Sequence, residues 1–244
     1  MKAVWRWLVL VLLALLALQV FMVLRVASMA IVDPSSTSFE RSQIWQVLQR
    51  RGQIAWRQTW VDEGQIASTL KRAVIASEDD IFARHGGIRW DAIEQAWDRN
   101  SKAQERAQRQ AARKPGANVP VKMVGGSTIT QQLAKNLLLS GERNMVRKAQ
   151  EALLTLTLEA VMDKRRLLTL YLNHVEWGEG VFGAEAAAQH YFRKPARALS
   201  AWEAARLAVM LPRPRYFEQR PQSAYLAERA DVIVQRMGGV ELPK

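Results

Sequence analysis

Residues 125–136 read Gly-Gly-Ser-Thr-Ile-Thr-Gln-Gln-Leu-Ala-Lys-Asn. Thr128 and Gln131 have the spacing of a capping box, in which each side chain bonds the backbone amide of the other residue. This pattern predicts a helix that begins after Thr128, and Gly141 is placed to end it. The two glycines before the helix allow a backbone or a ligand to approach closely. The sequence therefore predicts a helix start that presents hydroxyl, amide and ammonium groups.

The rest of the chain also has mostly helical patterns. Apolar residues recur at helical spacing over 66–74, in a helix that we expect to end near Glu78, and again over 154–161. Residues 200–203, Ser-Ala-Trp-Glu, form a second capping box before an alanine-rich helix that Pro212 stops. Alternating strand patterns are scarce, so we predict a mainly α fold.

Residues 8–24 form an apolar run in which Gln19 is the polar exception. At about 1.5 Å per residue this run spans roughly 25 Å as a helix, a little less than a hydrocarbon core of ~30 Å. A snorkelling Arg25 would extend it. Lys2 and Arg6 favour a cytoplasmic N-terminus, which places the rest of the chain across the membrane. We predict an uncleaved, single-pass anchor of the cytoplasmic (inner) membrane, with the remaining chain on its periplasmic, outer face.

The competing interpretation of this segment is a cleaved signal peptide, because Ser28-Met29-Ala30 resembles a cleavage site. The apolar run exceeds the usual ~7 to 15 residues of a signal core, which favours the anchor. Both interpretations export the rest of the chain. We divide the sequence into an N-terminal signal-anchor segment over 1–32, a linker and juxtamembrane region over 33–59 and one folded domain over 60–244.

The composition excludes several classes of protein. The chain has 244 residues and no cysteine, which excludes disulfide scaffolds, thiolate zinc sites, iron–sulfur clusters and cysteine nucleophiles. Its net charge of +12 predicts attraction to a polyanion, such as nucleic acid, an anionic membrane or a phosphorylated substrate. Export argues against nucleic acid. The three histidines lack the spacing of a metal-binding helix motif, so we predict no histidine-built metal site.

Basic residues gather over 98–122, where seven lysines and arginines accompany two acids and give a net charge of +5. Charge runs of this kind usually stay in water, so we expect a solvated, mobile insertion. The alternative is a specific anion-binding role. In that case the basic side chains would lie on anionic lipid headgroups, each contributing up to ~1 kcal/mol.

Three other patterns carry less weight. Residues 178–183 fit G-x-G-x-x-G, but no clear strand precedes them and no acidic residue follows about twenty positions later, so we predict no dinucleotide site. Residues 68–71 fit the S-x-x-K of penicillin-binding acyl-enzymes without the partner motifs. Tyr191, Phe192 and Trp202 are expected in the core, because aromatic residues among alanines usually point inward.

Further motifs accompany residues 125–136. They are Ala-Ser-Glu-Asp-Asp-Ile-Phe-Ala-Arg-His-Gly-Gly over 76–87, Arg-Lys-Ala-Gln-Glu over 147–151, Tyr-Leu-Asn over 171–173 and Trp-Gly-Glu-Gly-Val-Phe-Gly-Ala-Glu-Ala-Ala-Ala over 177–188. Acids beside hydroxyl, amide and cationic clusters suit an anionic, sugar-like substrate. In this order and spacing the motifs resemble those of the peptidoglycan glycosyltransferases of glycosyltransferase family 51, and among them the monofunctional biosynthetic peptidoglycan transglycosylases. The resemblance covers roughly residues 60–216 and the anchor.

The resemblance implies a lysozyme-like, mainly helical glycosyltransferase domain with a membrane-facing jaw. Such an enzyme polymerises lipid II at the outer face of the cytoplasmic membrane, joins disaccharide units through β-1,4 bonds and releases undecaprenyl pyrophosphate. Its partners would be lipid II, the growing glycan strand, membrane lipids and proteins of cell-wall synthesis or division. Fewer than thirty residues follow Tyr216, so we expect no transpeptidase domain.

The resemblance assigns Glu78 as the general base and Glu151 as a second essential acid at the pyrophosphate. A sugar hydroxyl is a poor nucleophile at neutral pH, so a carboxylate must take its proton during attack on the anomeric carbon. At a helix end Glu78 would meet the negative end of the helix dipole, which would raise its pKa. Taken alone, Glu78 would be a solvated helix-end residue, and Arg147 with Glu151 an ordinary surface i, i+4 pair.

The departing pyrophosphate needs fixed cations or a metal ion, because negative charge builds on its bridging oxygen. The residues predicted to bind substrate are Ser127, Thr128, Gln131, Gln132, Lys135, Asn136, Arg143, Arg147 and Lys148. Thr128 and Gln131 also serve the capping box, so Ser127 and Gln132 are the stronger ligand candidates. We predict no tightly bound cofactor and no protein metal site; a divalent cation such as Mg²⁺ or Mn²⁺ would assist at the pyrophosphate. The residues expected to shape the cleft are His85, Asn173, Gly178, Gly180 and Gly183.

Two features depart from the family pattern. Ile88-Arg89 follows Gly87 where the family has a hydrophobic residue and an aspartate, and the basic stretch over 98–122 is longer than expected. The alternative functions are a membrane-anchored, muramidase-like glycan hydrolase, whose glutamate would act as a general acid, and an inactive cell-wall scaffold. A hydrolase releases no pyrophosphate, so the cationic residues favour the synthase.

Overall fold

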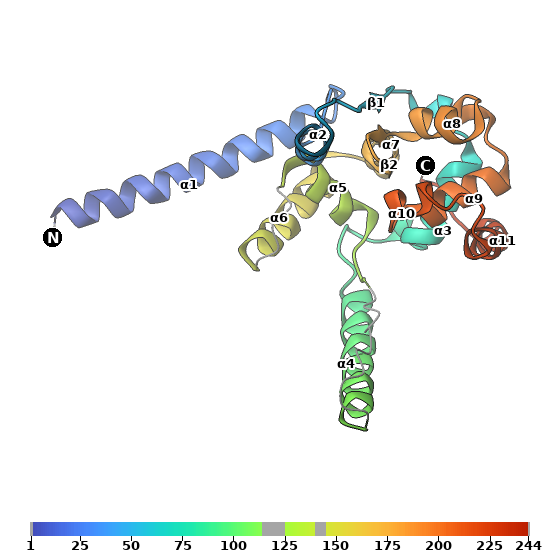
Figure 1. Cartoon of the computed structure of the whole chain (residues 1–244). Helices are drawn as coiled ribbons and strands as arrows, with labels where there is room; N and C mark the ends of the chain where they lie inside the picture. Colours follow the sequence, from blue (N-terminus) through green and yellow to red (C-terminus); the bar gives the residue numbers. More distant parts are fainter. Residues whose placement is uncertain (1, 114–124, 140–144, 244) are drawn as a thin grey trace.

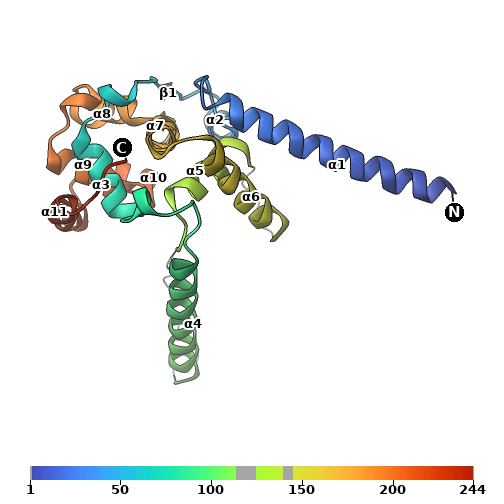
Figure 2. The same ribbon diagram turned by 180° about the vertical axis from the view of Figure 1, so that it is seen from behind.

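The computed structural model describes residues 2–113, 125–139 and 145–243. Helices dominate it, so the predicted mainly α fold is confirmed (Figure 1). Two helices extend away from the body in both views of the chain (Figures 1 and 2). They are α1 (Lys2–Ser28), which carries the N-terminus, and α4 (Trp90–Arg113), which projects in another direction. The other elements form the body.

The body consists of two groups of packed helices. In the first group α3 (Ser68–Glu78) packs on α9 (Ala201–Met210) and α11 (Ala224–Met237). In the second group α5 (Ile129–Leu138) packs on three helices, α2 (Ser38–Arg51), α6 (Met145–Val161) and α7 (Lys164–His174). The remaining helical elements are α8 (Ala184–Phe192), α10 (Pro214–Glu218) and the 3-10 turns η1 (Glu63–Gln65), η2 (Phe82–Arg84) and η3 (Ala196–Ala198). One hydrophobic core joins the two groups.

The predicted helix ends are largely confirmed. Both capping boxes form: Thr128 and Gln131 bond each other's backbone amides at 3.0 and 3.1 Å, and the box of residues 200–203 opens α9. α3 ends at Glu78, as expected. α5 ends at Leu138, and Gly141, the residue predicted to end it, lies outside the described residues.

The strands form one small sheet. β1 (Arg57–Gln58), β2 (Glu176–Gly178) and β3 (Val181–Phe182) lie in the order β1-β3-β2, with β1 parallel and β2 antiparallel to β3. The glycines of the G-x-G-x-x-G pattern build this hairpin and the start of α8. Gly180 has φ +74°, and a Cβ there would lie 2.2 Å from the carbonyl oxygen of Ala55. Close backbone approach therefore explains the glycine.

Two expectations need correction. Residues 38–51, which the sequence placed in the linker and juxtamembrane region, form α2, which buries Glu40 and Val47 against the body. Residues 98–113 of the basic stretch belong to the helix α4, and residues 114–122 lie outside the described part. Trp202 is 42% exposed and so is not a core residue, and the Arg206 guanidinium lies over its ring, 4.7 Å from the ring centroid.

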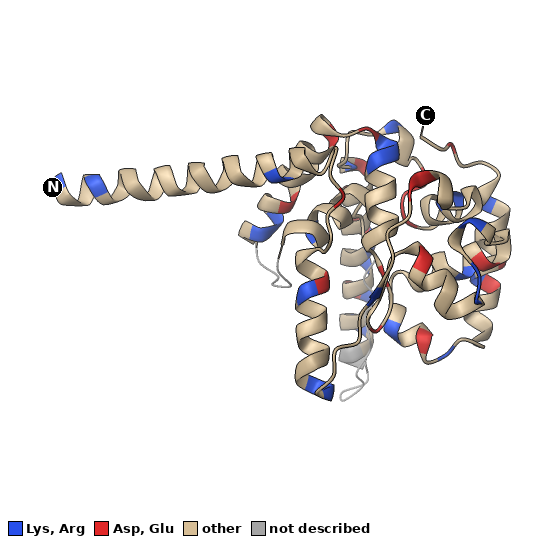
Figure 3. Cartoon of the chain, turned by 90° about the horizontal axis from the view of Figure 1, so that it is seen from above, with Lys and Arg blue, Asp and Glu red and all other residues tan. Residues whose placement is uncertain are grey.

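α1 is long and apolar enough to cross a membrane, and its hydrophobic window is not buried by the protein. Figure 3 shows charged residues only near its two ends. The end of the helix joins the body, where Val26 and Met29 are buried in the core. Arg166 of α7 donates to the Met29 carbonyl at 2.7 Å and pairs with Asp33 at 2.6 Å. These bonds fix the point at which the chain leaves α1.

Candidate active site

Glu78 is the last residue of α3, and its half-buried side chain lines a cavity. The loss of surrounding water raises the pKa of Glu78 above its ordinary value. Hydrogen bonds from Gln132 and Ser77 oppose this rise, and the charge of Asp79 adds to it. The predicted direction of the pKa shift thus agrees with the structure, but its main cause is burial.

A chain of hydrogen bonds orients the Glu78 carboxylate. Gln132 Nε2 donates to Glu78 Oε2 at 2.9 Å, and the Tyr171 hydroxyl donates to Gln132 Oε1 at 3.0 Å. Tyr171 is fully buried, which raises the pKa of its hydroxyl well above the usual value. The tyrosine therefore keeps its proton and remains a donor, so the amide of Gln132 must turn its NH₂ group toward Glu78.

Asp79 ties the end of α3 to the start of α5. Its buried carboxylate accepts hydrogen bonds from the backbone amide of Ile129 at 3.1 Å and from His85 Nε2 at 2.9 Å. His85 Nδ1 accepts from the Gly87 amide at 3.0 Å, so the ring proton lies on Nε2, facing Asp79. A carboxylate at the positive end of α5 is stabilising. The pair thus holds residues 125–136 against the end of α3.

Arg89 stands at a position where the family pattern has an aspartate, and three aspartates surround its side chain. Its guanidinium pairs with Asp80 at 2.8 Å and Asp91 at 3.0 Å, and it reaches within 4.0 Å of Asp79. A cation therefore lies beside the acidic residues that follow Glu78.

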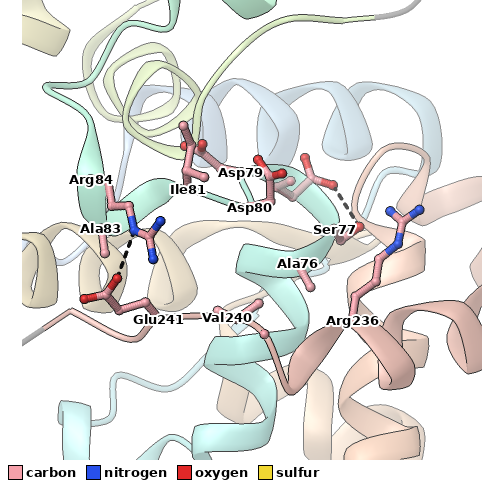
Figure 4. Close-up of a pocket in the computed structure, with 12 residues that line it drawn as sticks. Ala76, Ser77, Asp79, Asp80, Ile81, Ala83, Arg84, Arg236, Val240 and Glu241 are labelled. Carbon is pink, nitrogen blue, oxygen red and sulfur yellow. Dashed lines mark hydrogen bonds and ion pairs between the residues drawn. The ribbon is translucent and has the colours of Figure 1, made fainter.

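The cavity beside Glu78 has a volume of about 650 Å³. One wall consists of residues 76–81, and the opposite wall comes from Arg236 and residues 239–241 near the C-terminus. Figure 4 shows Arg84 paired with Glu241 within this cavity, and their atoms Nε and Oε2 lie 3.0 Å apart. Both signs of charge therefore surround the space that Glu78 faces.

A second cavity, of about 460 Å³, contains most of the other predicted site residues. Its lining consists of Phe39, Gln43, Gln46, Ser127, Gln131, Gln132, Lys135, Leu139, Arg147, Lys148 and Glu151. Three of these residues are cations and one is an acid. Gln132 lines this cavity and also bonds Glu78, so it connects the two sites.

Glu151 holds two of the cations. Its carboxylate is buried, with the residue only 3% exposed. Arg147 Nη1 lies 3.5 Å from Oε2, and Lys148 Nζ bonds Oε1. The predicted i, i+4 pair therefore exists, and burial of the acid distinguishes it from an ordinary surface pair. Loss of one partner would leave an uncompensated buried charge, which is strongly unfavourable.

The other predicted residues have different positions. Thr128 and Gln131 are buried and engaged in the capping box, although Gln131 also touches the second cavity. Asn136 is buried, and Arg143 lies outside the described residues. The residues expected to shape the cleft, His85, Asn173 and the hairpin glycines, are absent from the described walls of both cavities. Asn173 instead bonds the backbone of Val61.

Several residues of the two cavities, and Tyr171 of the hydrogen-bond chain to Glu78, were not among the predicted site residues. Phe39, Gln43 and Gln46 come from α2, which the sequence assigned to a linker. Tyr171 was part of a motif without a role, and the residues near the C-terminus carried no motif. The capping box of α2, Thr37 with Glu40, was a signal that could have located this helix.

Residues 46–238, which include Glu78, Gln132 and Glu151, match the sequence profile of a family described as transglycosylase. The chain belongs to the transglycosylase family. It is 50% identical over 230 residues to a biosynthetic peptidoglycan transglycosylase of Burkholderia thailandensis, which covers 94% of this chain and 84% of the relative. It is 49% identical over 242 residues to a protein of the same description from Paraburkholderia phytofirmans, which covers 98% of this chain and 94% of the relative.

Membership of the transglycosylase family confirms the predicted enzyme class, a glycosyltransferase, and the lysozyme-like fold class. The matched range begins inside α2. Part of the segment that the sequence analysis called a linker therefore belongs to the transglycosylase domain.

Proposed function

We propose that this transglycosylase polymerises lipid II into β-1,4-linked glycan strands and releases undecaprenyl pyrophosphate. The observation that carries the proposal is the position of Gln132. This side chain orients Glu78, a carboxylate of raised pKa, and also lines a cavity with Lys135, Arg147 and Lys148. Gln132 thus links a base to a cationic site that suits an anionic leaving group.

Glu78 is the proposed general base. The hydroxyl oxygen of one sugar forms a bond to the anomeric carbon of the other substrate, its proton moves to Glu78, and the bond from that carbon to the pyrophosphate oxygen breaks. A raised pKa makes Glu78 a stronger base than an exposed glutamate. Gln132 and Tyr171 keep the accepting carboxylate in one orientation.

The cations of the second cavity stabilise the leaving pyrophosphate in this proposal. Lys135, Arg147 and Lys148 supply positive charge where negative charge builds. Glu151 acts through them: its buried carboxylate holds Arg147 and Lys148 in place before substrate arrives. Ser127 and Gln132 are proposed contacts for the sugar or the phosphate.

A divalent cation would find few protein ligands here. Among the described residues, no group of three or more His, Cys, Asp or Glu side chains could hold a metal ion. In the described lining of the second cavity the only carboxylate is Glu151, which already bonds two cations. These residues do not form a metal site of their own, so we assign no step to Mg²⁺ or Mn²⁺ and propose no tightly bound cofactor.

The proposed location is the outer face of the cytoplasmic membrane, with α1 as an uncleaved anchor. Lys2 and Arg6 favour this orientation. Cleavage after Ala30 would remove Val26 and Met29 from the core and the Met29 carbonyl from Arg166. The proposed partners are membrane lipids, the growing glycan strand and proteins of cell-wall synthesis or division. We propose no nucleic-acid partner.

Polymerisation of labelled lipid II by detergent-solubilised, full-length protein tests the proposal. We expect wild-type protein to form polymer that a muramidase digests to disaccharides. Glu78→Gln should abolish polymer formation, because the amide cannot accept the proton. Glu94→Gln, the same chemical change at an exposed position of α4, should leave the rate unchanged.

Two outcomes would overturn the proposal. If lipid II stayed intact while preformed strands were shortened, the chain would be a muramidase-like hydrolase. If folded protein did neither, the chain would be a cell-wall scaffold.

A further inference from the structure

The described lining of the second cavity has two walls of different chemistry. Its cations lie on α5 and α6, whereas α2 contributes Phe39, Gln43 and Gln46. In this described lining α2 supplies no charged side chain. A charged pyrophosphate therefore matches the wall formed by α5 and α6, and an uncharged group rich in oxygen atoms matches the α2 wall.

The three side chains of the α2 wall occupy one face of the helix. Phe39, Gln43 and Gln46 are four and three residues apart, which places them within about 60° around the helix axis. All three are half-buried. An aromatic ring beside two primary amides suits an amino sugar, because the ring packs on the C–H face of a pyranose and the amides bond its hydroxyl and acetamido groups.

The buried carboxylate of Glu40 fixes the rotation of α2 and so keeps this face toward the cavity. Glu40 Oε2 accepts from the Thr37 amide at 2.8 Å. Glu40 Oε1 accepts from Gln58 Nε2 at 3.1 Å and from His174 Nδ1 at 2.8 Å. Gln58 and His174 belong to β1 and α7, so rotation of α2 about its axis would break buried hydrogen bonds.

Arg215 of α10 sets the direction of the Gln43 amide. Arg215 Nη2 donates to Gln43 Oε1, and Arg215 Nε donates to Oε1 of the buried Glu176 at 2.8 Å. A cation therefore occupies the amide oxygen of Gln43, which leaves the NH₂ group to bond a ligand in the cavity. Gln43 thus presents a hydrogen-bond donor on the α2 wall.

We propose that Phe39, Gln43 and Gln46 form a subsite for the amino sugar that is bonded to the pyrophosphate of the substrate. The Gln43 NH₂ group donates to a hydroxyl or acetamido oxygen of this sugar, and the Phe39 ring packs on its C–H face. The subsite rests on the proposed function, because that function supplies the sugar-linked pyrophosphate. Arg215 is a positioning residue that acts through Gln43.

Two ligands that share the lipid and the pyrophosphate test the subsite. Their affinities for full-length protein in detergent are measured with lipid II and with undecaprenyl pyrophosphate, which lacks the sugars. Every sample carries Glu78→Gln to prevent turnover. Gln43→Met removes the donor, so Kd for lipid II should rise about tenfold while Kd for undecaprenyl pyrophosphate stays unchanged. Lys148→Gln removes a cation of the other wall and should weaken both ligands.

Matched variants separate the sugar contact from other effects on α2. Gln49→Met, the same change at an exposed position of α2 outside the described lining, should leave both affinities unchanged. Phe39→Leu keeps an apolar contact without the flat ring and should raise Kd for lipid II about threefold. Unchanged lipid II affinity in Gln43→Met, or an equal loss for both ligands, would overturn the subsite.

Lipid II from which an amidase has removed the peptide distinguishes the sugar from the peptide. This ligand keeps both sugars, so Gln43→Met should weaken its binding as much as it weakens the binding of intact lipid II. If only intact lipid II responded to the substitution, the α2 wall would bind the peptide, and the sugar assignment would be wrong.

A double-variant comparison tests the positioning role of Arg215. Lysine is a point charge and cannot hold Gln43 and Glu176 together as the guanidinium fork does. Arg215→Lys should raise Kd for lipid II about fivefold and leave Kd for undecaprenyl pyrophosphate unchanged. Adding Arg215→Lys to Gln43→Met should produce no further loss, because the oriented donor is already absent. Additive losses, or equal losses for both ligands, would overturn this role.

Polymer formation separates failure of the subsite from failure of the proposed function. Protein without Glu78→Gln that forms no polymer, although Gln43→Met selectively weakens lipid II binding, would overturn the proposed function and leave the subsite intact. Protein that forms polymer, but whose Gln43→Met variant binds both ligands as tightly as the parent, would overturn the subsite alone.

Discussion

At the scale of single residues, the burial of Glu78 has a consequence for stability. A carboxyl whose pKa is raised in the folded protein binds its proton more tightly when folded than when unfolded. Its ionised form therefore destabilises the fold at pH values above the raised pKa, and this effect disappears when both states are protonated. The burial that makes Glu78 a stronger base therefore also lowers the stability of the folded protein.

Glu78→Gln should consequently raise the unfolding temperature at pH 8. The amide removes the buried charge and can still accept from Gln132, and we expect a rise of roughly 2 °C. Thermal unfolding at pH 8 and at pH 4 measures it, because the difference should be much smaller at pH 4, where the carboxyl is largely protonated in both states. The control Glu94→Gln should leave the unfolding temperature unchanged at both pH values. A lower unfolding temperature for Glu78→Gln at pH 8 would show that the buried charge of Glu78 does not destabilise the fold.

The hydroxyl of Tyr171 should matter for turnover more than for substrate affinity. Tyr171→Phe removes the donor to Gln132 and frees the amide to rotate away from Glu78. A lost hydrogen bond of about 1 to 1.5 kcal/mol predicts a fall in kcat of about tenfold, with KM nearly unchanged. Steady-state kinetics with lipid II checks this split, and an unchanged kcat would show that the chain of hydrogen bonds does not orient the base.

At the scale of elements, the start of α5 separates structural from ligand-binding residues. Thr128 caps the helix, and its hydroxyl also donates to the Gly87 carbonyl at 2.5 Å. Thr128→Ala should therefore lower the free energy of unfolding by about 1 to 2 kcal/mol. The neighbouring Ser127→Ala should leave stability unchanged and raise KM. Chemical denaturation together with kinetics distinguishes them, and equal effects of the two variants would contradict the division.

The elements that could be predicted from the sequence are those with local signals. Capping boxes located the starts of α5 and α9, and apolar spacing located α3 up to Glu78. The family motifs identified Glu78 and Glu151 as candidate site residues. The spacing of the motifs along the sequence could not show which side chains are in contact. Contacts such as Tyr171 with Gln132 depend on how α7 packs on α5, which no local pattern encodes.

α2 and Trp202 illustrate two different failures. α2 is mostly polar, so periodicity did not reveal a helix that buries Glu40 and supplies a cavity wall. Trp202 follows an inward-facing pattern, but it is 42% exposed and its ring contacts the guanidinium of Arg206. Tertiary contacts decided both cases, and local sequence carries little of that information.

At the scale of the whole molecule, the basic side of α4 extends away from the body and predicts a dependence on lipid charge. Among the side chains of α4 that the structure describes, the exposed cations on this side are Arg99, Lys102, Arg106 and Arg109. Replacing all four with glutamine should raise KM for lipid II at least about fivefold in vesicles with phosphatidylglycerol, since each cation near an anionic surface contributes up to ~1 kcal/mol. In vesicles of phosphatidylcholine alone the variant should match wild type. An equal effect in both membranes would exclude the electrostatic explanation.

The initial rate of lipid II polymerisation as a function of pH tests the central claim most directly, because Glu78 must lose its proton before it can act as the base. The account predicts an ascending limb whose apparent pKa lies above the ordinary glutamate value, and a rate for Glu78→Gln that is close to zero at every pH. A wild-type rate that shows no ascending limb as the pH rises from acidic to neutral would contradict the account. So would a Glu78→Gln variant that keeps its activity.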